Sequence, residues 1–193
     1  MSPGGWRDIG LVLAAGAGLR YGEPKAGVIW QGERLVDRSI RLLRKAGCGE
    51  VLVVLGAWQA ELQDCRTIVN AHWSQGLASS LRCGLEALSS SSGDPTGAPA
   101  RAVITLVDLP GLTAEAILRV CSRPEDLVAA CYGGERGHPV LIGESHWPGV
   151  LASLKGDRGA GAYLANHGQE LHLVEVGDIA SGEDLDQPRQ AQE

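Results

Sequence analysis

The sequence contains no phenylalanine, one methionine and only 4% aromatic residues in a chain of 193 residues. Its core must therefore consist of valine, leucine, isoleucine and alanine, with five tryptophans as isolated large side chains. The hydrophobic share of 44% is that of a globular protein, and domains usually run about 100–200 residues. We therefore expect residues 1–193 to form a single domain. A chain of this length needs no disulfide or metal to stabilise its core.

The sequence also lacks a basic excess, cysteine pairs and a long apolar run. Lysine and arginine number 17 against 23 acidic residues, and this net charge of −6 argues against a dedicated nucleic-acid-binding protein. The five cysteines form no CxxC pair, so we expect reduced thiols in a cytoplasmic protein. No apolar run approaches the roughly 20 residues of a membrane span. The start of the chain lacks the order of a signal peptide. Nucleic acids and membranes are therefore not expected as partners.

Apolar runs of strand length alternate with helical patterns along the chain. Strands are predicted at residues 9–15, 51–55, 66–70, 102–107, 127–132, 139–142 and 171–176, and helices at 35–46, 78–88, 114–121 and 158–167. This alternation predicts βαβ units, and therefore an α/β protein built as a three-layer α/β/α sandwich around a mostly parallel sheet. Residues 89–99 are predicted to be a mobile surface loop, and residues 184–193 a polar tail.

A glycine-rich loop with two basic residues follows the first predicted strand. Ligands bind at the carboxyl ends of strands in such sheets, and residues 13–25 read LAAGAGLRYGEPK at one such end. Gly16, Gly18 and Gly22 permit close approach of the backbone, while Arg20 and Lys25 supply positive charge for phosphate oxygens. The loop matches neither a Rossmann fingerprint nor a P-loop. We interpret it as a different polyphosphate-binding loop; the alternative is a surface turn with adjacent basic side chains.

Acidic residues follow two later segments. Asp108 stands at the end of the predicted strand 102–107, where a carboxylate can hold Mg²⁺ against phosphate oxygens or can cap a turn before proline. Asp184 and Asp186 lie two residues apart, so both carboxylates point to one side if the segment is extended. They are either a second part of a metal site or members of a solvated acidic tail.

Several ordered blocks of the sequence resemble one family. Residues 13–25 resemble the LAAG-A-G-x-R-[YMF]-G-x-P-K signature of MobA/MocA-like nucleotidyltransferases, particularly the molybdenum cofactor cytidylyltransferase-like branch. Residues 70–84, 107–110, 136–140, 156–159 and 184–188 resemble further blocks of that family in the same order. The resemblance spans nearly the whole chain. It implies a Rossmann-like fold of the nucleotide-diphospho-sugar transferase type.

The resemblance also implies roles for individual residues. The side chains and backbone groups that it assigns to the nucleoside triphosphate are those of Ala14, Ala15, Gly16, Gly18, Arg20, Lys25, Asn70, Gly76 and Ser80. The sequence LAAG, rather than LAGG, favours cytosine as the base. Mg²⁺ would be held by Asp108 with Asp184 or Asp186, and His138 would face the acceptor or be hydrogen-bonded within its own turn. The catalytic residues would be Arg20, Lys25 and Asp108.

The implied reaction is a Mg²⁺-dependent transfer of CMP from CTP to a phosphate-bearing acceptor, with molybdopterin as the expected acceptor and pyrophosphate as the product. An acceptor phosphate is already an anion and needs no general base, so alignment and charge stabilisation would carry catalysis. A molybdoenzyme or a chaperone is an expected protein partner. Two alternatives stay open: an NAD(P)H-dependent oxidoreductase on the same loop scaffold, and a non-catalytic nucleotide-binding module that delivers a cofactor.

Overall fold

The computed structural model describes residues 7–90 and 100–186, and its centre is a seven-stranded sheet. The strands are β1 (Arg7–Ala14), β4 (Glu50–Leu55), β5 (Arg66–Val69), β6 (Ala100–Leu106), β7 (Leu127–Tyr132), β8 (Glu135–Gly143) and β9 (His172–Glu175). They lie in the order β5-β4-β1-β6-β8-β7-β9, and only β8 runs antiparallel to its neighbours β6 and β7. The predicted mostly parallel sheet is therefore confirmed.

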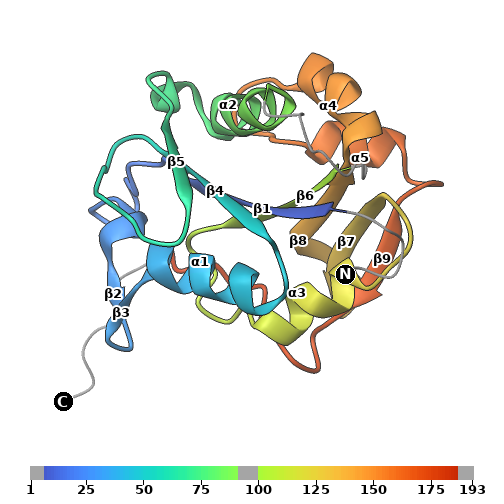
Figure 1. Ribbon diagram of the computed structural model, residues 1–193, viewed down its shortest axis with the longest axis horizontal. Coiled ribbons are helices and arrows are strands. Elements are labelled where there is room, and N and C mark those ends of the chain that lie inside the picture. The colour runs from blue at the N-terminus through green and yellow to red at the C-terminus, as the bar shows by residue number, and fades with distance from the viewer. Residues whose placement is uncertain (1–6, 91–99, 187–193) are drawn as a thin grey trace.

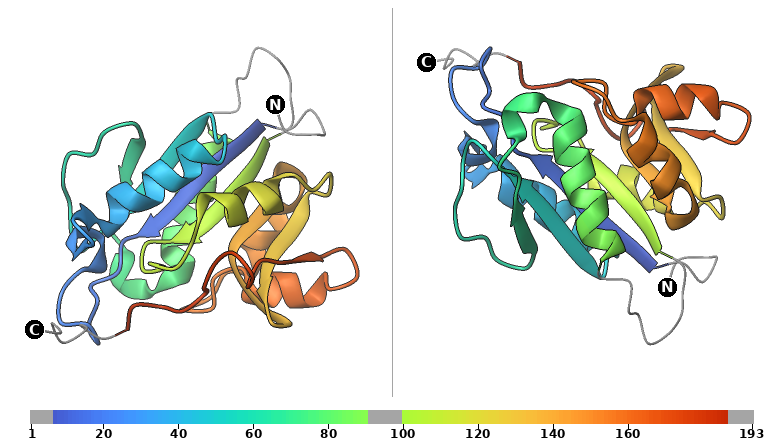
Figure 2. Two further views of the ribbon diagram at one scale, coloured as in Figure 1. Left: turned by 90° about the horizontal axis from the view of Figure 1, so that it is seen from below. Right: turned by 90° about the horizontal axis from the view of Figure 1, so that it is seen from above.

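Helices cover both faces of this sheet (Figures 1 and 2). One face packs against α1 (Leu35–Lys45) and α3 (Ala114–Cys121), and the other against α2 (Leu77–Ser89), α4 (Trp147–Ser153) and α5 (Gly161–Asn166). Alternate residues of each central strand enter opposite cores, as the two-residue period of a strand requires. Val12 of β1 lies in the α1 and α3 core, whereas Leu11 lies in the α2, α4 and α5 core. The three-layer α/β/α architecture is thus confirmed.

Local sequence signals set several boundaries. Helix α3 begins where predicted, because the Thr113 side chain accepts a hydrogen bond of 3.1 Å from the backbone N–H of Ala116. Helix α1 is followed by Gly47, whose φ of +95° lies in the left-handed region that favours glycine. The chain then returns to the sheet as β4. Residues such as Thr113 and Gly47 mark where helices begin and end, so the alternation of strands and helices could be predicted from the sequence.

Other predictions need correction. The helix expected over 158–167 is shorter, because Gly159 adopts a φ of +49° and keeps the preceding segment in a loop until α5 begins at Gly161. Helix α4 and the two-stranded hairpin of β2 (Ile29–Trp30) and β3 (Glu33–Arg34) are additional elements that no local pattern predicts. Strand β8 is longer than the predicted 139–142, because it begins at Glu135 directly after the turn that ends β7.

Short 3-10 turns complete the chain between these elements: η1 (Lys25–Gly27), η2 (Trp73–Gln75) and η3 (Glu144–His146). Of the predicted mobile loop 89–99, Ser89 ends α2, and residues 91–99 lie outside the described residues. Residues 187–193 of the predicted tail also lie outside them. Within residues 7–90 and 100–186, no helix combines the length and the apolar character that a transmembrane span requires.

Candidate functional site

The glycine-rich loop and the end of β6 enclose a cavity of about 420 Å³ at the carboxyl edge of the sheet. This position follows from the fold, since β1 and β6 are parallel neighbours and their carboxyl ends meet. Five of the predicted site residues line the cavity: Gly16, Gly18, Arg20, Lys25 and Asp108. Leu13, Leu77 and Leu106 supply an apolar floor. The structure therefore brings the predicted phosphate loop and the predicted metal ligand into one cavity.

The loop holds its shape through glycine at two turning points. Gly18 has a φ of +61°, and a Cβ atom there would collide with the carbonyl oxygen of Glu23. Its own carbonyl accepts a hydrogen bond of 2.8 Å from the N–H of Gly22, which has a φ of +99°. The chain then enters η1 at Lys25, and Ala26 is buried in the core. This anchor fixes the base of the Lys25 side chain at the cavity wall.

Lys25 is the centre of the site's charge network. Its Nζ donates a hydrogen bond of 2.8 Å to Oδ2 of Asp108 and lies 3.4 Å from Oδ1 of Asp186. Arg20 Nη1 lies 3.3 Å from Oδ2 of the same Asp186, and the Arg20 side chain is 82% exposed. The two cations predicted to bind phosphate thus contact the acids predicted to bind metal. These contacts link the four side chains in the order Arg20, Asp186, Lys25 and Asp108.

Residues 176–186, called the strap below, follow β9 and carry Asp184 and Asp186 toward Asp108. Leu185 is buried in the α1 and α3 core, and its backbone N–H donates a 2.9 Å hydrogen bond to the carbonyl of Asp108. Asp184 and Asp186 flank this anchor. The pKa of Asp184 is raised by burial, and further by the negative charges of Asp108 and Asp186. Of the two acids, Asp186 contacts Lys25 and Arg20, whereas Asp184 is an exposed residue that lines a separate hollow beside Trp30.

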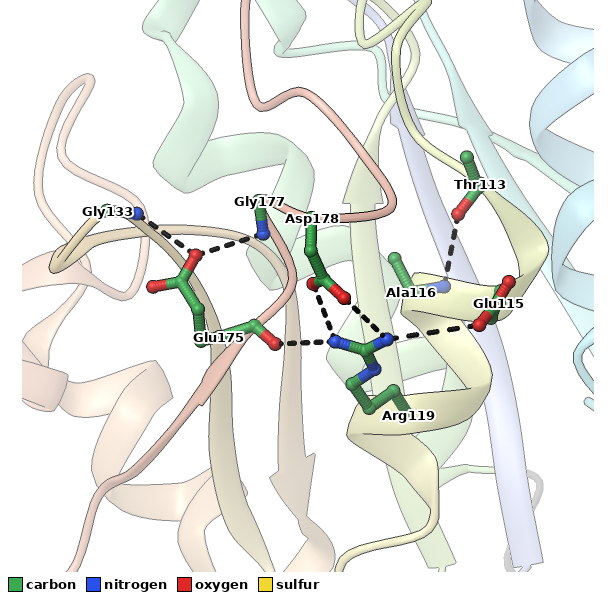
Figure 3. A network of polar contacts seen from close by, with 8 residues as sticks. All are labelled: Thr113, Glu115, Ala116, Arg119, Gly133, Glu175, Gly177 and Asp178. Carbon is green, nitrogen blue, oxygen red and sulfur yellow. Dashed lines mark hydrogen bonds and ion pairs between the residues drawn. The ribbon is translucent and has the colours of Figure 1, made fainter.

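The start of the strap is tied to α3 and to the β7–β8 turn (Figure 3). Arg119 donates to both carboxylate oxygens of Asp178, at 2.7 and 3.1 Å, and to the carbonyl of Glu175 at 3.1 Å. The Glu175 carboxylate accepts hydrogen bonds from the N–H groups of Gly133 at 3.0 Å and Gly177 at 2.9 Å. These contacts fix the direction in which the strap leaves β9.

The residues predicted to surround the cytosine base do not line the 420 Å³ cavity. Ala14 and Ala15 are buried at the end of β1. The Asn70 amide is also buried, and its Nδ2 lies 2.8 Å from Oγ of Ser79 and 3.2 Å from Oγ of Ser80. Asn70 therefore fastens the segment after β5 to α2. It lines a separate hollow of about 700 Å³ between the end of β5 and α2, and not the 420 Å³ cavity at the glycine-rich loop, which is called the phosphate cavity below after its predicted ligand.

Gly76 stands where the backbone enters α2. It has a φ of +97°, and a Cβ atom there would collide with the Asp157 carboxylate. The following residue, Leu77, lines the phosphate cavity. Gly76 thus brings the start of α2 and the loop of Asp157 close together, which accounts for a glycine here without a ligand contact.

His138 lies in a neighbouring cavity of about 200 Å³. Its Nδ1 is 3.2 Å from the carbonyl oxygen of Ile104 and, because that oxygen only accepts, Nδ1 carries the proton. Burial lowers the pKa of His138, although the Ile104 contact and the charge of Asp108 oppose that shift. The hydrogen bond expected within the turn of His138 is therefore wrong, because its partner is Ile104 of the neighbouring strand β6. The predicted contact of His138 with the acceptor stays a prediction.

The donor chemistry around Asp108 fits Mg²⁺ only in part. Carboxylate oxygens are the ligands that Mg²⁺ prefers, and its sites commonly take one or two carboxylates and complete the shell with phosphate oxygens and water. Within the described ranges, no group of three or more His, Cys, Asp or Glu side chains is arranged to hold a metal by itself. Phosphate and water oxygens would have to supply the remaining ligands.

Sequence reasoning missed Arg136, Arg158 and Leu77 as lining residues. Both arginines lie in blocks that the family resemblance had already marked, at 136–140 and 156–159, yet neither was singled out. The signal that could have found them is a cation beside glycine in each block. Leu77 gave no separate signal, because an apolar residue at the start of a helix is ordinary.

The fold and this edge define a three-layer α/β protein with a glycine-rich, basic loop after its first strand, at the edge where such sheets bind ligands. Comparison with known proteins makes this specific: the chain belongs to the family of MobA-like NTP transferase domains, whose model matches residues 10–171. The predicted nucleotidyltransferase family is therefore confirmed. The particular molybdenum cofactor branch stays a prediction.

Individual proteins resemble this chain over most of its length. Nicotine blue oxidoreductase of Paenarthrobacter nicotinovorans is 34% identical, and the match covers 92% of this chain and 91% of that protein. The structure of an Rv0371c homologue from Mycobacterium sp. strain JC1 is 27% identical over 94% of this chain and 91% of its own, with a TM-score of 0.73. The inositol-1-phosphate CTP transferase of T. maritima shares the fold at 16% identity and a TM-score of 0.71, covering 96% and 91%.

Proposed function

We propose that this protein is a Mg²⁺-dependent cytidylyltransferase that moves CMP from CTP to a phosphate-bearing acceptor, with molybdopterin as the expected acceptor. The observation that carries the proposal is the 420 Å³ cavity in which the glycine-rich loop, two cations and Asp108 meet. Membership of the NTP transferase family supports the reaction type. The sequence LAAG supports cytosine as the base, and the T. maritima CTP transferase has the same fold. The site is expected to work in the cytoplasm beside a molybdoenzyme or chaperone partner.

The residues of the cavity would act on the transferring phosphoryl group. An oxygen of the acceptor phosphate forms a bond to the α-phosphorus of CTP, and the bond between that phosphorus and the bridging oxygen breaks to release pyrophosphate. Backbone N–H groups of Gly16 and Gly18 would bind phosphate oxygens, and Arg20 and Lys25 would neutralise the charge that develops on the leaving group. The ion pairs of both cations with Asp186 would then be exchanged for contacts with phosphate.

Mg²⁺ would be held by Asp108 together with Asp184 or Asp186. When bound, a divalent ion of this kind supplies Lewis-acid stabilisation of phosphate oxygens. The raised pKa of Asp184, which burial and two neighbouring carboxylates cause, indicates negative charge that Lys25 and Arg20 do not fully compensate. A cation is favoured at such a place.

The first test replaces Asp108 by asparagine, which retains size and removes charge. We expect kcat/KM for pyrophosphate release from CTP, Mg²⁺ and molybdopterin to fall by about 100-fold or more, as when one preorganised electrostatic contact is lost. The matched control is Asp37→Asn, since Asp37 pairs with Arg34 and does not line the cavity. Turnover of Asp108→Asn within about threefold of the parent protein would refute the metal assignment.

A second candidate function is NAD(P)H-dependent oxidation–reduction, and the observation that favours it is the 34% identity to nicotine blue oxidoreductase. The two functions differ in what they consume. A cytidylyltransferase releases pyrophosphate and leaves the absorbance of NADPH unchanged, whereas an oxidoreductase oxidises NADPH and has no need of CTP. The protein is incubated with CTP and molybdopterin, and separately with NADPH and a quinone-type dye that accepts its two electrons, each with and without Mg²⁺. Release of pyrophosphate or loss of NADPH absorbance decides between the two functions. If CTP binds tightly in every acceptor mixture without turnover, the non-catalytic delivery module is favoured.

A further inference from the structure

Two arginines stand apart from the others in the described residues. Arg136 and Arg158 make no side-chain hydrogen bond or ion pair within that part of the chain, whereas every other arginine there makes at least one. Both line the 200 Å³ cavity that contains His138. The Arg136 guanidinium reaches from β8 to Gly161: a Cβ atom built on Gly161 would lie 3.9 Å from Arg136 Nη2. Gly161 is only three residues after Arg158, so the two arginines approach the cavity from its two sides. Two cations without protein partners therefore converge on one cavity.

The rest of this cavity is apolar and adjoins the phosphate cavity. Leu13 and Leu77 line both cavities, which places the two side by side at the carboxyl edge of the sheet. Leu81 and Leu164 add further apolar surface. His138 gives the cavity a neutral polar group: because its Nδ1 proton is used by the Ile104 carbonyl, Nε2 is left as a hydrogen-bond acceptor. A ligand that fits has an anionic group, a compact apolar body and an N–H or O–H donor.

We infer that this second cavity is the acceptor site and that Arg136 and Arg158 select an acceptor carrying a phosphate monoester. The inference rests on the proposed function and specifies the chemistry of its acceptor. Arginine presents paired N–H donors that match the oxygens of a phosphate, and such charge-assisted hydrogen bonds are among the stronger ones in proteins. Two cations beside the phosphate cavity also offset the repulsion between an anionic acceptor and a nucleoside triphosphate.

The test uses phenyl phosphate as a probe that combines a phosphate monoester with a small apolar body. Its dissociation constant, and separately that of CTP with Mg²⁺, is measured calorimetrically for the parent protein, Arg136→Ala, Arg158→Ala and the double variant. We expect each single change to weaken phenyl phosphate binding about tenfold and the double change more, while CTP affinity changes less than about threefold. Phenol, which lacks the phosphate, should bind weakly to all four proteins.

Two further variants control for charge and fold. Arg158→Lys keeps the positive charge but loses the paired donors, and should restore part of the lost affinity. Arg123→Ala removes an exposed arginine that pairs with Glu125 outside the cavity and should change neither dissociation constant. Far-ultraviolet circular dichroism verifies that every variant is folded.

Each outcome bears on one of the two proposals. If phenyl phosphate affinity is unchanged in the double variant, the acceptor assignment is wrong, while CTP binding leaves the proposed transferase intact. If CTP affinity falls by the same factor as that of phenyl phosphate, the arginines bind the nucleotide and the acceptor assignment is again wrong. If CTP does not bind the parent protein but phenyl phosphate binds through the arginines, the anion site stands and the cytidylyltransferase fails. NADPH and NADH form the last pair of probes: selective, arginine-dependent binding of NADPH assigns the site to its 2′-phosphate and overturns the acceptor.

Discussion

Strands β1 and β6 carry an ion-pair cluster at each end, and the two clusters differ in how completely their donors are used. Near the amino ends, Asp8 and Arg101 are direct neighbours in the parallel register. Just beyond the carboxyl ends, Lys25 contacts Asp108 and Asp186. The Arg101 side chain is 0% exposed, whereas Asp186 is 45% exposed. The same pair of strands thus has a sealed cluster at one edge and an open one at the other.

The sealed cluster leaves no donor unused. Arg101 donates to both oxygens of Asp8, at 2.8 and 3.0 Å, and to the backbone carbonyls of Cys121, Arg123 and Glu125. A guanidinium has five N–H donors, and these contacts use all of them. A ligand can reach neither the charge nor the donors. This arrangement is that of a structural ion pair, which links the start of the sheet to the end of α3.

The open cluster is incompletely paired. Its contacts to Asp186 are long, at 3.3 and 3.4 Å, and Arg20 is largely in solvent. An anionic ligand can therefore replace the Asp186 carboxylate at little cost, because Asp186 and Arg20 are already solvated. Charged groups can bind a ligand only where the protein itself does not use all of their hydrogen-bonding capacity. Arg136 and Arg158 represent the extreme of this condition.

The largest effect is expected where the sealed cluster is broken. Replacement of Arg101 by alanine leaves Asp8 as a buried carboxylate without its guanidinium and opens a cavity between β6 and α3. Removing one partner of a buried ion pair typically costs about 3–5 kcal/mol, and we expect the free energy of unfolding in urea to fall by that amount. The control is Arg41→Ala, whose exposed pair with Glu33 should contribute about 0–1 kcal/mol. A loss below about 1 kcal/mol for Arg101→Ala would show that the sealed cluster is not structural.

A smaller change in stability, with a large change in binding, is expected at the open cluster. Lys25→Met keeps most of the apolar stem and removes the charge, which leaves Asp108 and Asp186 facing each other. We expect the free energy of unfolding to fall by about 1 kcal/mol and the affinity for CTP to fall by about 30-fold or more. Urea unfolding and calorimetric titration of the same preparation give the two values. Equal losses of stability in Lys25→Met and Arg101→Ala would remove the distinction between the two clusters.

The two clusters also differ in how readily they could be predicted from the sequence. The carboxyl-edge loop was predictable because glycines and cations stand together within residues 13–25, where each local signal supports the next. The sealed cluster was not predicted: Arg101 is the second residue of a strand that is otherwise largely apolar, and nothing local indicates that Asp8 of another strand neutralises it. Contacts between segments far apart in the chain leave no periodic pattern. The same reason accounts for the missed convergence of Arg136 and Arg158.

Fold prediction failed for a related reason. The sequence predicted the sheet, because apolar runs ending in glycine are local, but it did not predict α4 or the antiparallel start of β8. Gly27 is an example of a position where tertiary packing, and not a local motif, determines which residue type fits. A Cβ atom there would lie 2.7 Å from Nε1 of Trp58, so the indole occupies the space that a larger side chain would need. Trp58 gave no sequence signal that it packs against Gly27.

The smallest effect is expected at the contacts of Arg119 with the start of the strap. These contacts lie outside the open cluster and influence it only through the position of the strap. Arg119→Ala removes the contacts with Asp178 and the Glu175 carbonyl, so the segment that carries Asp184 and Asp186 should become less ordered. We expect an unchanged urea midpoint but up to about tenfold weaker binding of Mn²⁺, which replaces Mg²⁺ as a paramagnetic probe measured by electron spin resonance. Arg119 touches neither the nucleotide cavity nor its acids, and acts only as a positioning residue. Arg123→Ala, which removes a comparable exposed pair away from the strap, should leave Mn²⁺ binding unchanged. Equal Mn²⁺ affinities in Arg119→Ala and the parent protein would mean that Leu185 and its bond to the Asp108 carbonyl suffice to place the acids.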